Sequence, residues 1–208
     1  MTAPQFTLPL SYKLLTAVNV ASSTDKTRHY LQGVHLEVTP GRIVYTATDG
    51  HILLTASEDT KHEVDRFSAI IPRAAIDQLK IPAKNGYGDV TLTSRGGNKF
   101  TLDSKKTGVG IQGSFIDGSF PDWRRIVALV DAPPRPDDKF VYTIVPRLLS
   151  RLGEAGKIVG AATPVFRPSG NNPWPVAFPS APSIYGVVMP ERWLVSSVDF
   201  NLPAWARA

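Results

Sequence analysis

The sequence predicts an α+β fold that is built from repeated β-α-β-β-β units. The first observation is a near-literal repeat, in which Ala-Ile-Ile-Pro-Arg at 69–73 returns as Thr-Ile-Val-Pro-Arg at 143–147. The second is that both segments, like Gln-Phe-Thr-Leu-Pro-Leu at 5–10, read as apolar strands followed by an amphipathic helix and then alternating strands. Such internal repetition indicates about three copies of one structural unit.

The first unit begins with the strand at 5–10 and continues into a helix expected at 11–22. Four apolar residues of this helix recur at helical spacing and fall on one face. They are Leu14, Leu15, Val18 and Ala21. Further strands are expected at 29–38, 42–50 and 51–58, with the turn Thr-Pro-Gly-Arg between the first two.

The second and third units repeat this order. The second has an entering strand at 66–73, a helix at 74–79 and strands at 89–95, 99–105 and 108–116. Its link Ser-Arg-Gly-Gly-Asn-Lys is typical of a tight hairpin. The third has an entering strand at 139–147, a helix at 148–159 and proline-rich strands at 163–168, 173–178 and 183–190.

These units predict the domain organisation. Two units form one complete domain at 1–130, and the third forms a half domain at 139–192. Residues 131–138 read as a linker, because consecutive prolines can continue neither a helix nor a central strand. Residues 193–208 form a C-terminal extension.

The composition limits the classes of function. With 208 residues, 42% of them hydrophobic and 20% charged, the chain can bury a real core. The sequence has no run of about 18 apolar residues and no basic-then-apolar start, so we expect a cytoplasmic protein without a membrane span. Zero cysteines exclude disulfides and thiolate sites, and the four isolated histidines indicate no metal site. The net charge of +5 weakly suggests an anionic partner.

Two motifs that resemble catalytic or cofactor sites are better explained as ordinary structure, the first as a strand followed by a glycine-rich turn and the second as a hairpin. Gly-Val-Gly-Ile-Gln-Gly at 108–113 matches a dinucleotide-binding pattern, but the residues after it cannot open the helix that this site needs. Ala-Thr-Asp-Gly-His at 47–51 places a carboxylate near an imidazole, but its Asp-Gly step between apolar strands favours a hairpin. We therefore expect no catalytic residues, no cofactor and no enzymatic activity.

The segment Phe-Ile-Asp-Gly-Ser-Phe-Pro-Asp-Trp-Arg-Arg-Ile-Val at 115–127 allows two interpretations. It is either a solvated basic surface with Trp123 half buried, or a rim at which Pro121, Trp123 and Arg125 border an apolar hollow.

Taken together and in order, the motifs at 6–9, 28–37, 47–51, 70–73 and 116–125 resemble the bacterial sliding clamp, the beta subunit of DNA polymerase III. The likeness covers its middle domain over residues 5–130, and Tyr-Gly-Val-Val-Met-Pro-Glu-Arg resembles the closing segment of the clamp. The resemblance implies the DNA-clamp fold, with sheets outside and helices on the inner face around duplex DNA. It suggests a clamp of about one and a half domains, shortened as a phage or mobile element could encode it.

The stretch at 5–10 also fits the short peptides that bind such clamps, which run glutamine, apolar, small, leucine, then Pro-Leu or Phe. The repeat favours a strand over a peptide ligand, because this stretch holds the same place as the strands that enter the other two helices.

A clamp must hold DNA without reading its bases, so it needs diffuse positive charge facing duplex DNA. Ordinary solvated helix faces remain an equal alternative for each basic residue. The expected DNA-binding residues are Lys13, Lys26, Arg28, His29, Tyr30, Arg73, Lys80, Arg147, Arg151 and Lys157.

The resemblance also implies a hydrophobic pocket for peptides of a DNA polymerase or another replication protein. It would comprise Leu31, Thr48, Gly50, His51, Leu53, Pro121, Arg125, Ile126, Val187, Val188, Met189, Pro190 and Arg192. Two positions depart from the family pattern: Ile52 replaces an arginine, and Glu191 replaces an apolar residue, which would disfavour acidic peptides.

The expected function is that of a DNA processivity factor acting as a homo-oligomer. The third unit lacks its usual partner, so we expect a second chain or the extension at 193–208 to cover it. The alternative is a clamp-like interaction protein that forms no ring and competes with, or adapts, the peptide partners of the host clamp.

Overall fold

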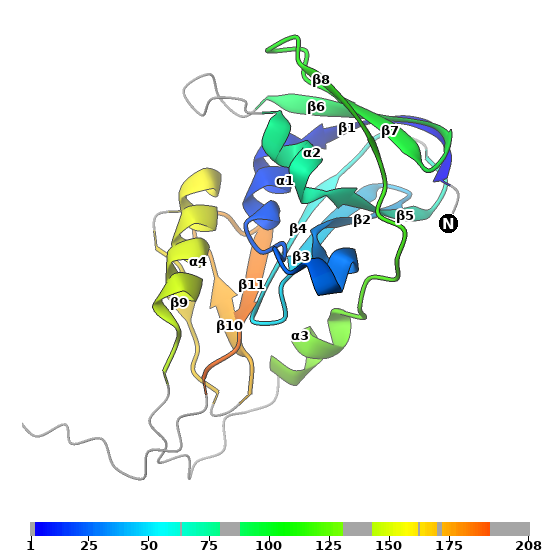
Figure 1. Cartoon of the computed structure of the whole chain (residues 1–208). Helices are drawn as coiled ribbons and strands as arrows, with labels where there is room; N and C mark the ends of the chain where they lie inside the picture. The colour runs from blue at the N-terminus through cyan, green and yellow to red at the C-terminus, as the bar shows by residue number, and fades with distance from the viewer. Residues whose placement is uncertain are drawn as a thin grey trace, which may run out of the picture.

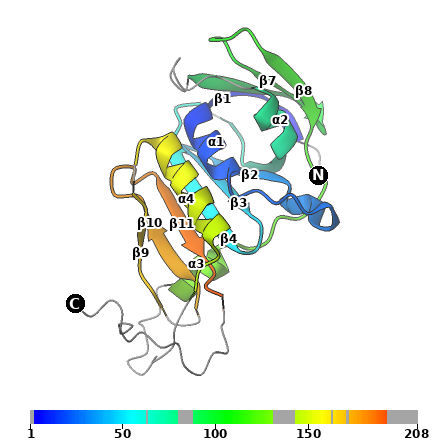
Figure 2. The same ribbon diagram turned by 60° about the vertical axis from the view of Figure 1, so that its left-hand side comes forward.

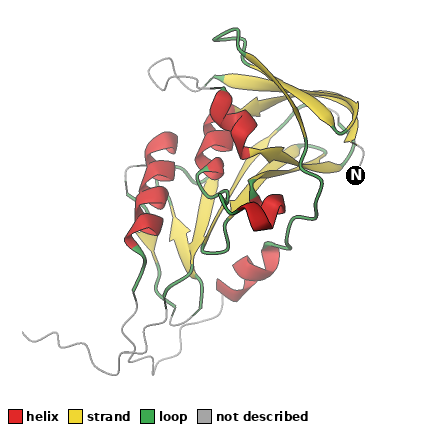
Figure 3. Ribbon diagram, viewed as in Figure 1, coloured by secondary structure: helices red, strands yellow, loops and turns green. Residues whose placement is uncertain are grey.

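Two antiparallel sheets form the frame of the structure, a computed structural model that describes residues 3–62, 64–79, 88–130, 143–161, 163–169 and 172–191. The smaller sheet has the order β1 (Ala3–Ser11), β6 (Asp89–Gly97), β7 (Lys99–Asp103) and β8 (Gly110–Ser114). The larger has the order β5 (Phe67–Pro72), β2 (Gly33–Thr39), β3 (Arg42–Thr48), β4 (Ile52–Asp59), β11 (Ile184–Val188), β10 (Trp174–Ala177) and β9 (Val165–Phe166). Figures 1 and 3 show both sheets together with the helices.

The first two units exchange their entering strands. Strand β1 pairs with β6 of the second unit, with Leu8 opposite Leu92, while β5 pairs with β2 of the first unit. The ring of Phe6 stacks on that of Phe67 with centroids 4.2 Å apart. Residues 5–10 therefore lie in a strand with one buried face, as the repeat predicts. Each of the first two units completes its sheet with a strand of the other.

Three helices, one from each unit, lie side by side with α1 in the middle (Figure 2). They are α1 (Tyr12–Asn19), α2 (Arg73–Gln78) and α4 (Pro146–Val159). The hydroxyl of Ser11 caps α1 by accepting the backbone N–H of Leu14 at 3.3 Å. Helix α4 starts with a proline in its first turn and ends at Val159, and the next residue, Gly160, caps it with a φ of 81° that suits glycine.

The third unit extends the sheet of the first. Strand β11 pairs antiparallel with β4, with Val187 opposite Leu53, and α4 packs on α1. The buried face of α4 carries Leu148, Leu152, Ala155 and Val159 at helical spacing. The expected linker at 131–138, the start of the strand at 139–147 and the extension at 193–208 lie outside the described residues.

Several expected elements differ from the observed ones. The strand expected at 29–38 begins at Gly33, because Lys26–Leu31 form a 3₁₀ helix, η1, whose first turn is capped by Asp25. A short helix, α3 (Arg124–Val130), occupies the end of the segment at 115–127. The first helix ends at Asn19 rather than at residue 22, and β9 has only two residues. No helix in the described ranges is long and apolar enough to cross a membrane.

The turn predictions hold. Gly41 between β2 and β3, Gly50 between β3 and β4, and Gly96 and Gly97 at the end of β6 all have positive φ values. This backbone region is available to glycine at little cost. The segment at 108–113 begins with a turn at Gly108 and continues as strand β8, with no helix directly after it, so it lacks the geometry of a dinucleotide site.

Candidate functional site

An apolar hollow of about 230 Å³ lies between the β3–β4 turn, the start of α3 and the end of β11. It brings together most of the residues expected to form a peptide pocket. These are Leu31, Thr48, Gly50, His51, Leu53, Pro121, Ile126, Val187 and Met189. Ile52, Asp122 and Trp123 complete the lining. The arrangement favours the rim interpretation of the segment at 115–127, with Pro121 and Trp123 in the wall.

Other expected pocket residues lie elsewhere. Val188 does not line the hollow and is fully buried in the main core, because successive residues of β11 point to opposite faces of the sheet. Pro190 is buried outside the lining, and the side chain of Arg125 is 84% exposed beside Asp122. Arg192 lies outside the described residues.

The two departures from the family pattern also have different places. Ile52 is buried, with 1% of its surface exposed, and lines the hollow. Glu191 is exposed, forms an isolated β-bridge with Thr143 and does not line the hollow. The sequence therefore replaces an expected arginine by an apolar wall residue, whereas the carboxylate of Glu191 stays outside the lining.

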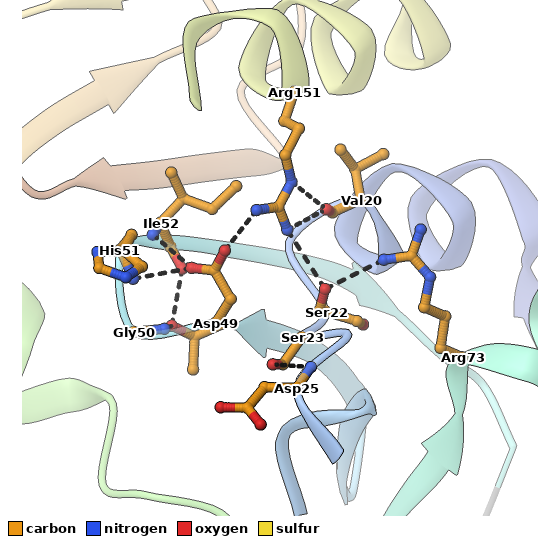
Figure 4. Close-up of polar contacts among 11 residues, drawn as sticks. Val20, Ser22, Ser23, Asp25, Asp49, Gly50, His51, Ile52, Arg73 and Arg151 are labelled. Carbon is orange, nitrogen blue, oxygen red and sulfur yellow. Dashed lines mark hydrogen bonds and ion pairs between the residues drawn. The ribbon is translucent and has the colours of Figure 1, made fainter. Parts of the chain in front are cut away.

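The β3–β4 turn forms one wall of the hollow, and its shape is fixed by two side chains (Figure 4). The Asp49 carboxylate accepts the backbone N–H groups of His51 and Ile52 at 2.8 and 3.0 Å. The Thr48 hydroxyl accepts the Gly50 N–H at 3.0 Å and donates to the Ile52 carbonyl at 2.7 Å. Burial opposes ionisation of Asp49, but hydrogen bonds from Ile52, Arg151 and His51 outweigh it and lower its pKa.

The opposite wall is held by Glu37 of β2. Its carboxylate accepts Trp123 Nε1–H at 3.1 Å and Arg124 Nη1–H at 3.0 and 3.1 Å. The Arg124 guanidinium also lies 4.3 Å from the centre of the Trp123 ring, a cation–π contact. Burial opposes the charge on Glu37, but the hydrogen bonds from Arg124 and Trp123 prevail and lower its pKa. Glu37 thus fixes the start of α3 against the larger sheet.

The second candidate surface is the face formed by α1, α2, α4 and η1. Arg147 and Lys157 of α4, with Lys26 and His29 of η1, are exposed. Lys13, Arg28 and Tyr30 are partly buried, and Arg28 pairs with Asp25 at 3.1 Å. Lys80 lies outside the described residues.

Arg73 and Arg151 have intramolecular partners (Figure 4). Arg151 donates to the Val20 carbonyl at 3.0 and 2.7 Å and forms an ion pair with Asp49. Arg73 donates to the Ser22 carbonyl at 3.1 Å and pairs with Asp77 at 3.2 Å. The carbonyls that follow α1 lack helical partners, and these guanidinium groups satisfy them. We assign both arginines a structural role, which the charge pattern of the sequence could not reveal.

Within the described ranges, no group of three or more His, Cys, Asp or Glu side chains is arranged to hold a metal ion. The geometry thus consists of an apolar hollow and a mixed-charge helical face.

Comparison with known proteins connects this geometry to a family. A model of the DNA polymerase III beta subunit, central domain, matches residues 10–122. The beta sliding clamp of Pseudomonas aeruginosa is 31% identical over 136 residues, which make up 62% of this chain and 33% of the relative. That of Rickettsia bellii is 29% identical over 119 residues, or 55% of this chain and 31% of the relative. The chain thus spans about a third of the length of these curated relatives.

Solved structures show the same fold. A DnaN sliding clamp from P. aeruginosa bound to griselimycin matches with a TM-score of 0.67 and 19% identity, over 92% of this chain and 67% of that one. A DnaN sliding clamp from Bartonella birtlesii, also bound to griselimycin, matches with a TM-score of 0.68 and 22% identity, over 93% and 67%. The expected clamp fold and the resemblance are therefore confirmed. The chain belongs to the family of the DNA polymerase III beta subunit, the bacterial sliding clamp.

Proposed function

We propose that the chain is a sliding-clamp-like processivity factor without catalysis of its own. It holds duplex DNA along the helical face without reading the sequence, and it tethers a polymerase or another replication protein through the apolar hollow. The observation that carries the proposal is the hollow itself, whose walls come from the first unit, the third unit and α3 in a chain of the clamp family.

The hollow suits a short apolar peptide. Leu53, Ile126, Val187 and Met189 offer apolar surface, while the turn at His51 offers polar groups at the edge. A groove of this kind buries two or three apolar side chains of an extended segment, and polar groups at its edge orient the backbone. Griselimycin is a second probe, because the matched clamps of P. aeruginosa and B. birtlesii are bound to it.

The test is fluorescence polarisation with a fluorescein-labelled hexapeptide, Gln-Leu-Ser-Leu-Pro-Leu. Helix α3 supplies a matched pair of variants, because Ile126 lines the hollow and is 37% exposed, whereas Leu129 is 53% exposed and lies outside the lining. Ile126→Glu is expected to weaken binding by more than about tenfold, since it places a carboxylate in an apolar wall. Leu129→Glu is expected to bind like the wild type. Equal losses in both variants, or no saturable binding by the wild type, would contradict the peptide site.

The DNA-facing part of the proposal relies on exposed cations. Arg147 and Lys157 lie on α4, and Lys26 lies on η1. Contacts to phosphates release counterions, so each lost contact lowers the salt dependence of binding by about one unit of log K per log salt. We expect Arg147→Gln to show this reduction with a 30-base-pair duplex, and the exposed Arg95→Gln on the distant strand β6 to leave it unchanged. Identical slopes for the two variants would argue against this face.

A homo-oligomer completes the proposal. Strand β9 is the last strand on its side of the larger sheet in the described part of the chain, and Val165 on it is 52% exposed. An exposed sheet edge is a ready site for pairing with another chain. A ring is expected to stay on circular DNA and to slide off the same DNA once it is linearised. Equal retention on both would favour the alternative, a clamp-like interaction protein that forms no ring.

A further inference from the structure

We propose that Arg151 and Asp49 are positioning residues for the apolar hollow, through which α4 of the third unit sets the shape of the peptide-binding wall. The inference rests on the proposed peptide site and adds that residues of the helical face determine the shape of that site. Neither residue lines the hollow; both line a polar groove of about 470 Å³ that lies behind the turn.

The first step is the dependence of the wall on Asp49. Four lining residues lie in or directly beside the β3–β4 turn around Asp49: Thr48, Gly50, His51 and Ile52. One oxygen of Asp49 binds two successive N–H groups of that turn, those of His51 and Ile52. Gly50 adopts a φ of 91°, which the turn imposes. Moving the carboxylate of Asp49 therefore moves the backbone of the wall.

The second step is the anchoring of Asp49 by Arg151. The other carboxylate oxygen of Asp49 pairs with Arg151 Nη1, while the remaining donors of Arg151 reach the carbonyls of Val20 and Ser22. The side chains of Arg151 and Asp49 are 25% and 13% exposed. One guanidinium thus ties α4, the end of α1 and the turn together, as Figure 4 shows. A planar, fork-shaped donor is needed for this, and lysine does not replace it.

The third step compares Arg151 with Arg73. Both donate to the Ser22 carbonyl, but the carboxylate partner of Arg73 is Asp77 of its own helix, which lies outside the hollow lining. Loss of Arg73 removes a cap from the same backbone and leaves Asp49 in place. Comparing variants of the two arginines therefore distinguishes a general loss of order near α1 from a specific change in the wall of the hollow.

The experiment measures hexapeptide affinity by fluorescence polarisation in four full-length proteins: wild type, Arg151→Met, Asp49→Asn and the double variant, with Arg73→Met as the control. Each single variant at the pair is expected to weaken Gln-Leu-Ser-Leu-Pro-Leu binding on the order of tenfold, and the double variant no further, as coupled residues do. Arg73→Met is expected to bind like the wild type. Amide hydrogen exchange by NMR supplies a second readout. In both single variants the amides of His51 and Ile52 should exchange faster than in the wild type, whereas exchange in the β6–β7 hairpin should stay unchanged.

Wild-type affinity and wild-type exchange in Arg151→Met would overturn the inference and leave the proposed peptide site standing. Additive losses in the double variant, or an equal loss in Arg73→Met, would also overturn it, because the pair would then have no specific effect on the wall. Absence of binding by the wild type would instead overturn the peptide site, and the inference with it.

Discussion

Replacing Glu37 by glutamine tests how α3 is held on the sheet. The Glu37 side chain is 25% exposed and accepts hydrogen bonds from Trp123 and Arg124. Glutamine keeps one acceptor oxygen for Trp123 but loses the charge that pairs with Arg124. A hydrogen bond to a charged group contributes about 1.5–3 kcal/mol when buried.

The size of the expected loss in stability depends on how exposed the ion pair of Glu37 and Arg124 is. The Arg124 side chain is 56% exposed, so solvent screening reduces its share to below about 1 kcal/mol. The weaker bond from Trp123 adds a few tenths, so Glu37→Gln should lower the free energy of unfolding by about 1 kcal/mol. For a chain of this size that equals a fall in Tm of about 2–4 °C.

The assay is urea denaturation followed by circular dichroism, with Asp59→Asn as the control. Asp59 is 91% exposed in a long ion pair of 3.9 Å with Arg42, so its loss should cost under about 0.5 kcal/mol. The folded state lowers the pKa of Glu37. The contribution of Glu37 to the free energy of unfolding is therefore present above its ordinary pKa of 4.5 and is lost as the pH falls through the lower folded pKa. The difference between wild type and Glu37→Gln should be constant from about pH 8 to 5.5. A difference no larger than that of Asp59→Asn would refute the anchoring role.

Two further predictions concern the core and α4. Burial raises the pKa of Tyr45, whose hydroxyl donates a hydrogen bond to Glu58. The contribution of Tyr45 to the free energy of unfolding is therefore present below its ordinary pKa of 10.0 and is lost as the pH rises through the folded value. Tyr45→Phe should remove this alkaline loss of stability in pH-dependent unfolding and cost about 1–3 kcal/mol at neutral pH. In α4, Gly153→Ala should stabilise by up to about 1 kcal/mol, since a Cβ there meets nothing within 4 Å. Gly156→Ala should destabilise in the same thermal unfolding assay, since its Cβ would lie 2.5 Å from the Ala161 carbonyl oxygen. The reverse order of the two alanine variants would contradict the packing of α4.

Local patterns in the sequence predicted the repeated elements well, because alternation, helical spacing and glycine turns act over short distances. The exchange of β1 and β5 between units was not readable, since strand pairing depends on contacts between residues far apart. Helix α3 and η1 were missed because proline, aspartate and aromatic residues nearby indicated loops, whereas tertiary contacts such as Glu37 with Trp123 hold α3 in place.

The candidate site likewise has features that the sequence predicted and features that depend on tertiary contacts. Leu53, Val187 and Met189, which the resemblance groups in one pocket, all line one hollow, because β11 pairs with β4. It could not show that Arg73 and Arg151 are used by backbone carbonyls, since a basic residue on a helix looks the same in sequence whether it faces DNA or caps a neighbour. Asp49 was read as a turn residue, and its link to α4 required the fold.

The most direct test of the proposed peptide site uses the methionine methyl groups. The chain has two methionines, Met1 and Met189, and Met189 lines the hollow. In protein labelled with ¹³C-methyl methionine, addition of the hexapeptide Gln-Leu-Ser-Leu-Pro-Leu should shift the Met189 signal in a saturable manner, leave the Met1 signal in place, and have no such effect in Ile126→Glu. A Met189 signal that stays unchanged at saturating peptide, or that shifts equally in Ile126→Glu, would contradict the assignment of the hollow as the peptide-binding site.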